Sequence, residues 1–331
     1  MGVHIIATGG TIASLADPRT GAVTAAVPIE ELVRAVPGLD AVGDVSREEI
    51  ARINGWNVTP QIMCEVSAAL NRALARDDVD GAVVTHGTDT VEETAFLCDV
   101  TLHSDKPVAF AAAMRSGSEL GADGPRNLLH AALVASSGEA RGIGAVLVLN
   151  DEIHAARWVR KRDSFRASAF TSPEHGPIGF VVDGTARIHW APRPVAPVGR
   201  PAALDMAVPV VSTYTGMDEN LIPAILATTG ASGLVVDGTG LGNVPGSAVS
   251  GIARAIESGL PVVVATRAPT GGTRAVYGGP GGGVTLRDLG ALPAGGLSAA
   301  KARLLLMVLL AEGLAGDALR RTWSQAVSAR A

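Results

Sequence analysis

Cysteine is scarce in this 331-residue chain, which contains only two. Cys64 and Cys98 are too few for a disulfide framework, and they do not have the spacing of a metal site. Both fall in segments expected to be helical, so we predict that they pack in a core. The seven histidines are scattered, and no pair has the spacing of two ligands on a helix. No metal hydrolase is therefore indicated.

Long apolar runs and a strong excess of one charge are also missing. The apolar run over residues 304–311 is far below the ~20 residues that span a bilayer, so we predict a buried helix there and no membrane partner. The residues after Met1 lack a basic stretch followed by an apolar one, so no secretory signal is visible and a cytoplasmic location is expected. A formal net charge of −5 does not indicate binding to nucleic acid.

Apolar residues and glycine are abundant by contrast. Hydrophobic residues make up 47% of the chain and charged residues 18%, which indicates a globular protein rather than a disordered one. A chain of this length can bury a substantial core and has room for two domains. The 40 glycines exceed the average share of ~7%, so we expect loops with unusual backbone conformations.

Short apolar runs alternate with amphipathic stretches, which predicts an α/β fold with a mostly parallel sheet covered by helices. A cluster of prolines over residues 193–209 predicts a linker between an N-terminal domain, 1–192, and a C-terminal domain, 210–331. The predicted strands are residues 4–7, 82–85, 108–112 and 145–149 in the first domain and 208–213, 234–236 and 262–266 in the second. In the first domain, one predicted helix starts at Pro60 and another starts after residue 90. In the second domain, the predicted helices cover residues 220–228, 247–257 and 298–312.

One loop with polar side chains follows directly after the first predicted strand. In open α/β sheets, ligands bind at loops that leave the carboxyl ends of the strands. Gly9 and Gly10 free the backbone to turn sharply, so that a substrate could approach Thr8. A threonine hydroxyl is a poor nucleophile until a base or a preorganised site activates it. The plainer interpretation is a turn that only connects two elements.

A second polar loop, residues 84–94, leads into a predicted helix. Thr90 and Glu93 have the spacing of a capping box, in which each side chain bonds to a free backbone N–H at the start of the helix. Thr88 and Asp89 would then lie at the positive end of the helix dipole, where backbone amides can hold an anion or a developing oxyanion. Alternatively, both residues are additional caps without a chemical role.

Lys161 is singled out because lysine is rare here. Of the 27 basic residues 24 are arginines, and Lys161 itself lies between Arg160 and Arg162. A positive charge alone could have come from another arginine, whereas lysine can lose its proton when it is buried near other cations. We therefore consider a neutral amine that takes a proton from Thr88 as a general base. The alternative is a solvated basic stretch.

Taken together, these segments resemble the bacterial L-asparaginase family along nearly the whole chain. Two separate threonine loops in the same order are a highly specific match. The matching stretches are ATGGTIA at 7–13, THGTDTVEETA at 85–95, AMRSGSELGADGPRN at 113–127, LND at 149–151, PTG at 269–271 and KAR at 301–303.

The resemblance implies a larger N-terminal and a smaller C-terminal α/β domain, assembled as a homo-oligomer, a dimer or a tetramer. It also implies that Thr8 attacks the side-chain amide of L-asparagine and that water hydrolyses the acyl-enzyme to aspartate, after ammonia has left. Thr88, Asp89 and Lys161 would orient the substrate and move protons, and Asp89 would bind its amino group. Asn243 would be lent to a neighbouring subunit's site. No metal or organic cofactor is implied.

Three departures from the family pattern concern the recognition of the substrate. Ala22 stands where many members have a tyrosine, Gly55-Trp56 where the family has Ser-Gln, and no acidic residue lies near Tyr277. A substrate α-carboxylate would lose the serine hydroxyl, and asparagine could bind ~10²-fold more weakly. Trp56 is then either a core residue or a residue that reshapes the pocket for a larger or less polar amide.

Two alternatives to asparagine hydrolysis follow. One is an amidase for another small carboxamide, such as glutamine, a D-amino acid amide or a metabolite amide. The other is a catalytically silent ligand-binding homologue, which the combination of Thr8 with Thr88, Asp89 and Lys161 argues against. The glycine-rich stretches 238–242 and 278–283 match neither the phosphate-binding loop nor the complete dinucleotide-binding motif.

Overall fold

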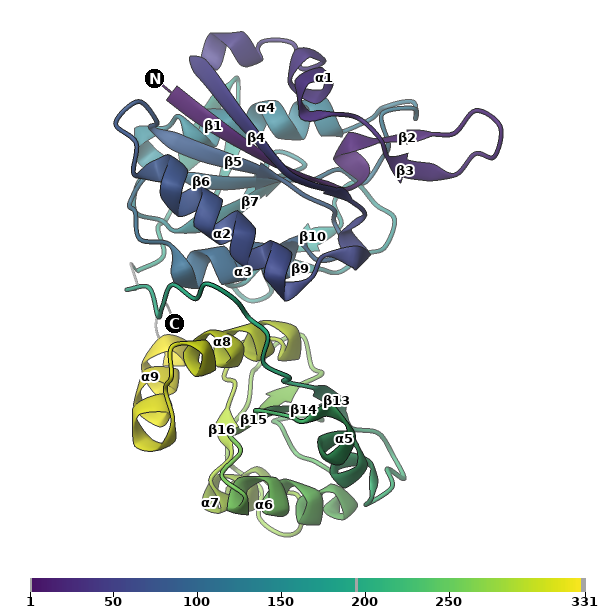
Figure 1. The fold of residues 1–331 in the computed structure, drawn as a ribbon, viewed down its shortest axis with the longest axis vertical. Coiled ribbons are helices and arrows are strands. Elements are labelled where there is room, and N and C mark those ends of the chain that lie inside the picture. The colour runs from purple at the N-terminus through teal and green to yellow at the C-terminus, as the bar shows by residue number, and fades with distance from the viewer. Residues whose placement is uncertain (1, 194–195, 329–331) are drawn as a thin grey trace. The chain divides into compact units, whose positions relative to one another are not determined.

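The computed structural model describes residues 2–193 and 196–328 and separates the chain into two compact units (Figure 1). The first unit ends at Pro197 and the second begins at Val198. The described part of residues 193–209 contains neither a helix nor a strand. Within the described residues, no helix combines the length and the apolar character needed to cross a bilayer.

An eight-stranded sheet forms the centre of the first unit, in the order β12-β11-β8-β7-β6-β5-β1-β4. The five strands from β7 to β4 are parallel, and β8, β11 and β12 extend the other side in antiparallel pairs. Short β-branched apolar runs form the middle strands because both of their faces are buried. The strands are β1 (Gly2–Gly9), β4 (Asp44–Ile53), β5 (Gly81–Thr85), β6 (Val108–Ala111), β7 (Ala145–Leu149), β8 (Glu152–Ala155), β11 (Gly179–Val182) and β12 (Thr185–Ile188).

Helices cover both faces of this sheet (Figure 1). On one face, α2 (Pro60–Leu74) and α3 (Val91–Thr101) pack on side chains such as Ile6, Val84 and Phe110. On the other face lie α1 (Ile29–Arg34) and α4 (Gly124–Ala135). The predicted start of α2 is confirmed, since the Thr59 hydroxyl accepts a hydrogen bond from Ile62 N.

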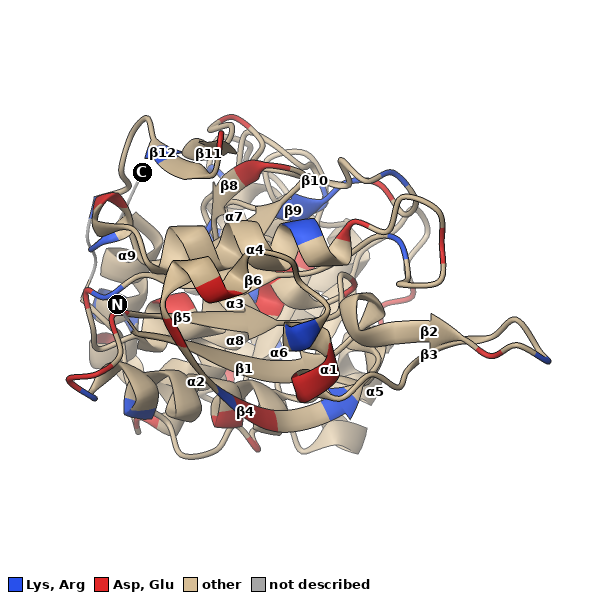
Figure 2. Ribbon diagram, turned by 90° about the horizontal axis from the view of Figure 1, so that it is seen from above, with Lys and Arg blue, Asp and Glu red and all other residues tan. Residues whose placement is uncertain are grey.

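Two short hairpins lie outside the large sheet. Strands β2 (Ser14–Ala16) and β3 (Val23–Ala25) pair only with each other, and their hairpin projects from the unit in both views (Figures 1 and 2). Strands β9 (Arg160–Lys161) and β10 (Phe170–Thr171) form the second pair. Ala22 lies just before β3 with an exposed side chain.

The second unit contains a four-stranded parallel sheet, β13-β14-β15-β16, with a core of its own. The apolar run over residues 304–309 is buried within α8, as predicted. The two-domain α/β fold is thereby confirmed. The elements are β13 (Val210–Ser212), α5 (Leu221–Thr229), β14 (Leu234–Gly238), α6 (Val249–Glu257), β15 (Val262–Thr266), α7 (Gly283–Leu289), β16 (Leu292–Pro293), α8 (Ala299–Ala311) and α9 (Gly316–Ser328).

Both cysteines are free thiols in the core, so the core-packing prediction is confirmed. Cys64 lies on α2 and Cys98 on the neighbouring α3. Burial raises the pKa of the Cys64 thiol to about 11 and also raises the pKa of Cys98 well above its usual range. Both therefore carry their protons at neutral pH and behave as small apolar side chains.

Candidate active site

Pairing of β1 with β5 brings the two threonine loops together. Ala7 lies opposite Thr85 in this parallel pair, so both strands end at the same edge of the sheet. Thr8 follows directly, and its Oγ1 donates a hydrogen bond to the carbonyl oxygen of Thr85 at 2.9 Å. The Thr8 residue is only 1% exposed. Its hydroxyl is therefore fixed by backbone, at the point where the second loop begins.

Three glycines from three different loops pack against one another next to the two threonine loops. A Cβ atom on Gly10 would lie 2.3 Å from the Cα atom of Gly87, and Gly10 also has a φ of +83°. On the other side, a Cβ atom on Gly87 would lie 2.6 Å from the Cα atom of Gly55. No side chain fits at these contacts, so the loops approach one another backbone to backbone. The loop after β4 thereby becomes part of the same site.

Lys161 reaches the second loop from the β9–β10 hairpin. Its Nζ donates hydrogen bonds to Thr88 Oγ1 at 2.9 Å and to Asp89 Oδ1 at 2.7 Å. Thr88 is buried, whereas 45% of the Asp89 side chain and 18% of the Lys161 side chain are exposed. The three predicted residues therefore lie in one hydrogen-bonded cluster that opens to solvent on the side of Asp89.

The predicted capping role of the Thr90 side chain at the start of α3 is wrong. Thr90 is the N-cap residue, but its side chain does not cap the helix. Its hydroxyl instead donates to the carbonyl oxygen of Gly55 at 2.6 Å. Because Gly55 packs directly against Gly87, its carbonyl oxygen lies within reach of Thr90, and the tertiary contact replaces the local one. The sequence pattern gave no indication of this partner.

His86 holds the turn between β5 and α3. It is fully buried, with Nδ1 2.9 Å from the carbonyl oxygen of Gly87 and Nε2 2.9 Å from the hydroxyl of Thr94. A carbonyl oxygen can only accept, so the hydrogen-bond network assigns the proton to Nδ1 and leaves Nε2 to accept from Thr94. Burial lowers the pKa of His86 to about 4. The imidazole is therefore neutral at pH 7 and acts as a fixed brace.

Trp56 is not a core residue, and that interpretation of the sequence is wrong. It lies in a short 3-10 helix, Gly55–Asn57, with 65% of the residue exposed. Gly55 beside it is buried and offers no hydroxyl group. An exposed indole therefore lies next to the Gly55–Gly87 contact.

The third matching stretch, residues 113–127, supports the same edge of the sheet. Asn127 Nδ2 donates to the carbonyl oxygen of Ala112 at 2.9 Å, and its Oδ1 accepts from Asn150 N at 3.1 Å. Asp123 accepts hydrogen bonds from the backbone of Met114 and Arg115. These bonds connect the loop after β6 with the turn between β7 and β8, so this stretch fixes backbone.

Asn243 lies in the second unit, in the loop after β14. Its Oδ1 accepts a hydrogen bond from Gly283 N at 3.1 Å, which fixes the orientation of the amide. Within the described residues, its NH₂ group has no hydrogen-bond partner. Two donors are therefore left over, and the predicted role of Asn243 at a neighbouring subunit's site stays a prediction.

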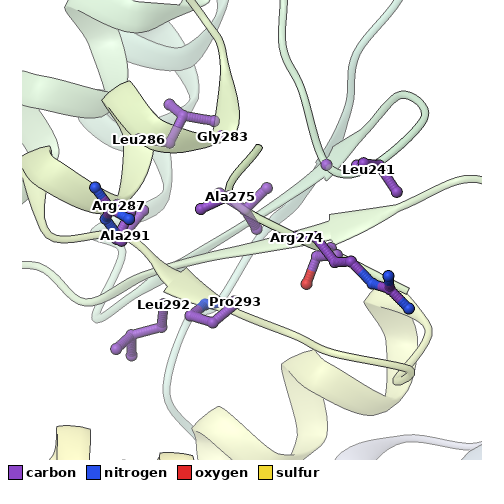
Figure 3. Close-up of a pocket in the computed structure, with 12 residues that line it drawn as sticks. Leu241, Arg274, Ala275, Gly283, Leu286, Arg287, Ala291, Leu292 and Pro293 are labelled. Carbon is purple, nitrogen blue, oxygen red and sulfur yellow. The ribbon is translucent and has the colours of Figure 1, made fainter. Parts of the chain in front are cut away.

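A cavity of about 150 Å³ also lies in the second unit (Figure 3). Its walls are mostly apolar, and the side chains of Arg274 and Arg287 lie apart at its edges. None of the predicted catalytic residues lines it. Across the described part of the chain, no three His, Cys, Asp or Glu side chains come close enough to hold a metal ion.

Comparisons with known proteins cover both units. Residues 2–194 match the family model described as "Asparaginase, N-terminal", and residues 207–322 match "Glutaminase/Asparaginase C-terminal domain". The chain is 38% identical to the "Probable L-asparaginase" of Deinococcus radiodurans, over 98% of this chain and 97% of that protein. It is 36% identical to "L-asparaginase 2" of Bacillus subtilis, over 93% and 82% of the two chains. The crystal structure of "Probable Cytoplasmic L-asparaginase from Campylobacter jejuni" superimposes with a TM-score of 0.87, at 30% identity and with coverage of 98% and 99%.

Proposed function

The chain belongs to the asparaginase family of amidohydrolases, and from this premise we propose that it hydrolyses the side-chain amide of L-asparagine to aspartate and ammonia. The proposal rests on the cluster in which Lys161 Nζ meets Thr88 at 2.9 Å and Asp89 at 2.7 Å. This cluster lies at the same edge of the sheet as the buried hydroxyl of Thr8. A nucleophile and a proton carrier in one site are what acyl transfer needs.

In the proposed reaction, Thr8 Oγ1 attacks the amide carbon. The new C–O bond forms an ester with the enzyme, the C–N bond breaks, and the hydroxyl proton leaves on the nitrogen as ammonia. Water then hydrolyses the ester, which releases aspartate and restores the Thr8 hydroxyl. The backbone N–H groups at the start of α3 can stabilise the oxyanion that forms in both steps.

Lys161 and Thr88 are proposed to move protons in this reaction. In the resting site Lys161 Nζ donates to Thr88 Oγ1, so the lysine must first release a proton to the solvent on the open side of the cluster, and this hydrogen bond must reverse. Thr88 could then pass a proton to or from the substrate nitrogen or the attacking water. Asp89, the most exposed of the three, is proposed to bind the substrate amino group as a carboxylate.

A second candidate is favoured by the pair Gly55-Trp56: hydrolysis of a different small carboxamide. The exposed indole offers an apolar surface and no hydroxyl group for an α-carboxylate. Glutamine, a D-amino acid amide or a metabolite amide are the alternatives. We further propose a cytoplasmic homo-oligomer, a dimer or a tetramer, in which the free NH₂ group of Asn243 completes a neighbour's site.

Ammonia release from L-asparagine, L-glutamine and D-asparagine at millimolar concentration tests the proposal. Wild type is compared with Thr8→Ala, and Thr228→Ala on the exposed side of α5 serves as a matched control. Turnover of asparagine that Thr8→Ala abolishes and Thr228→Ala retains would support the proposed reaction. With hydroxylamine added, trapping of the acyl group as a hydroxamate would report the ester. Preferred turnover of another amide would select the second candidate.

A further inference from the structure

The first turns of α3 are bound to three separate segments of the candidate site. Every second residue from 90 to 94 forms a side-chain hydrogen bond, and each of these bonds reaches a different segment. The contacts are Thr90 Oγ1 to the carbonyl oxygen of Gly55, Glu92 Oε2 to the backbone N–H of Lys161, and Thr94 Oγ1 to His86 Nε2. Sequence patterns do not predict any of them, since a helical first turn rich in Thr and Glu is ordinary.

The contact of Glu92 is the one that concerns the position of the lysine. Strand β9 has two residues and pairs only with β10, so the hairpin that carries Lys161 is not part of the large sheet. The N–H of Lys161 donates to the Glu92 carboxylate, across 69 residues of sequence. This is a hydrogen bond to an ionised acceptor, which is stronger than one between neutral groups.

Nζ of Lys161 lies at the end of four flexible carbon–carbon bonds and still reaches two acceptors at 2.9 and 2.7 Å. Because two acceptors must be met at once, a larger displacement of the lysine backbone from Thr88 and Asp89 would take Nζ out of reach of one of them. All three residues on the α3 side, Thr88, Asp89 and Glu92, lie within five consecutive positions. The hydrogen bond from the Lys161 backbone N–H to Glu92 therefore holds the lysine backbone next to the same short segment that carries the two acceptors of its Nζ.

We propose that Glu92 is a positioning residue, which holds the backbone of Lys161 so that its Nζ meets Thr88 and Asp89. The kinetic part of this inference rests on the proposed function, because it requires Lys161 to move protons during turnover. Glu92 itself touches no reacting atom. Its loss should therefore affect the chemical step far more than it affects substrate binding.

Steady-state kinetics of Glu92→Ala and Glu92→Gln test the effect on catalysis. We expect kcat to fall about 10²-fold in Glu92→Ala with KM almost unchanged, as for a catalytic group displaced by ~1 Å. Glu92→Gln keeps an acceptor oxygen and should recover most of that loss. Glu65→Gln, at a helix-surface glutamate that accepts a hydrogen bond from Gln61, is the matched control. An unchanged kcat in Glu92→Ala, or a loss confined to KM, would overturn the positioning role.

The three lysines of the chain provide a readout that does not depend on turnover. With ¹⁵N-lysine labelling, only Lys106, Lys161 and Lys301 give backbone amide signals. We expect the backbone and Nζ signals of Lys161 to move in Glu92→Ala and to stay in place in Glu65→Gln. Unmoved signals in a folded variant would overturn the inference whatever the kinetics show. If wild type cleaves no amide, the proposed function fails, and these signals alone decide whether Glu92 positions the lysine.

Should Glu92→Ala fail to fold, Glu92→Gln carries the same test. An amide oxygen accepts a weaker hydrogen bond than a carboxylate, so the Lys161 amide signal should still move upfield. A signal at the wild-type position in that folded variant would overturn the inference as well.

Discussion

The two threonine loops lie at the same edge of one sheet, but the hydroxyl groups of Thr8 and Thr88 have different hydrogen-bond partners. Thr8 is bonded to a backbone carbonyl, that of Thr85, and in the described structure no other side chain forms a hydrogen bond with its hydroxyl. Thr88 has Lys161 at 2.9 Å, and the same amine also contacts Asp89. Under the proposed mechanism, the proton carrier is therefore already assembled at Thr88, whereas the activation of Thr8 depends on what the bound substrate brings.

The loops are also held in place by different means. The first loop is held by the close approach of Gly10 to Gly87, where backbone meets backbone. The second is held by side chains, including the His86 imidazole and the carboxylate of Glu92. Added volume should therefore disrupt the contact that the two loops share, whereas loss of a hydrogen-bonding group should disrupt mainly the second loop.

The largest expected effect concerns Lys161, the proposed proton carrier at Thr88. In Lys161→Met we expect kcat for the preferred amide to fall by about 10²–10⁴-fold, the usual contribution of a general acid or base. Lys161→Arg keeps the positive charge but does not release a proton, so it should lose nearly as much. Measured kcat values for both variants check this. Near-normal activity of Lys161→Arg would show that only the charge matters.

A steric change at the first loop should destabilise the whole unit. Gly10→Ala places a methyl group 2.3 Å from Gly87 at a φ of +83°, and we expect a loss of about 3 kcal/mol or more in the free energy of unfolding. Gly21→Ala is the matched control, because Gly21 has a φ of +70° and open space around it. Urea unfolding of both variants separates the clash from the backbone strain. Equal losses would contradict a tight contact.

Acidic pH should weaken the hydrogen bonds through which His86 holds the second loop. The folded pKa of His86, about 4, lies below its unfolded value of 6.5. Its contribution to stability is therefore fully present above pH 6.5 and is lost as the pH falls from 6.5 towards 4, by on the order of 3 kcal/mol. Comparing His86→Gln with wild type from pH 7 to 4 isolates this residue from the other histidines. An identical slope in wild type and His86→Gln would contradict this role of His86.

The smallest expected effect concerns the loop after β4. A Cβ atom on Gly55 would lie 3.1 Å from the Gly87 backbone, so Gly55→Ser and Gly55→Ala share the same tight contact. Only the serine adds a hydroxyl group for a substrate α-carboxylate. We expect KM for asparagine to be about tenfold lower in the serine variant than in the alanine variant. Equal values would show that another group holds the carboxylate.

Much of the fold could be predicted because buried parallel strands are continuous apolar runs. Strand β7 matches its predicted range of residues 145–149, and β15 matches 262–266. Strand β4 was not predicted, since five of its ten residues are charged. It lies at the edge of the sheet, where one side faces solvent and the apolar pattern disappears.

For the site, the sequence indicated the residue types better than their partners. Thr88, Asp89 and Lys161 were singled out correctly as a group that lies together, from motif and lysine usage. The bonds of Thr90 to Gly55 and of Glu92 to Lys161 could not be predicted, because they cross 35 and 69 residues. A capping rule considers only hydrogen-bond partners that are close in the sequence. The Thr90 hydroxyl instead bonds to a carbonyl oxygen that is distant in the sequence.

The position of β1 between two strands that follow it in the sequence has a consequence for the biosynthesis of the protein. Although β1 is the first strand in the sequence, it lies between β4 and β5 in the sheet. At ~5–20 residues per second, a ribosome needs on the order of 4–15 s after β1 to complete both neighbours. Until β4 and then β5 are complete, an apolar, β-prone segment lacks one or both of its native partners and is open to aggregation. Expression at low temperature or with chaperones that bind nascent chains should therefore raise the soluble yield.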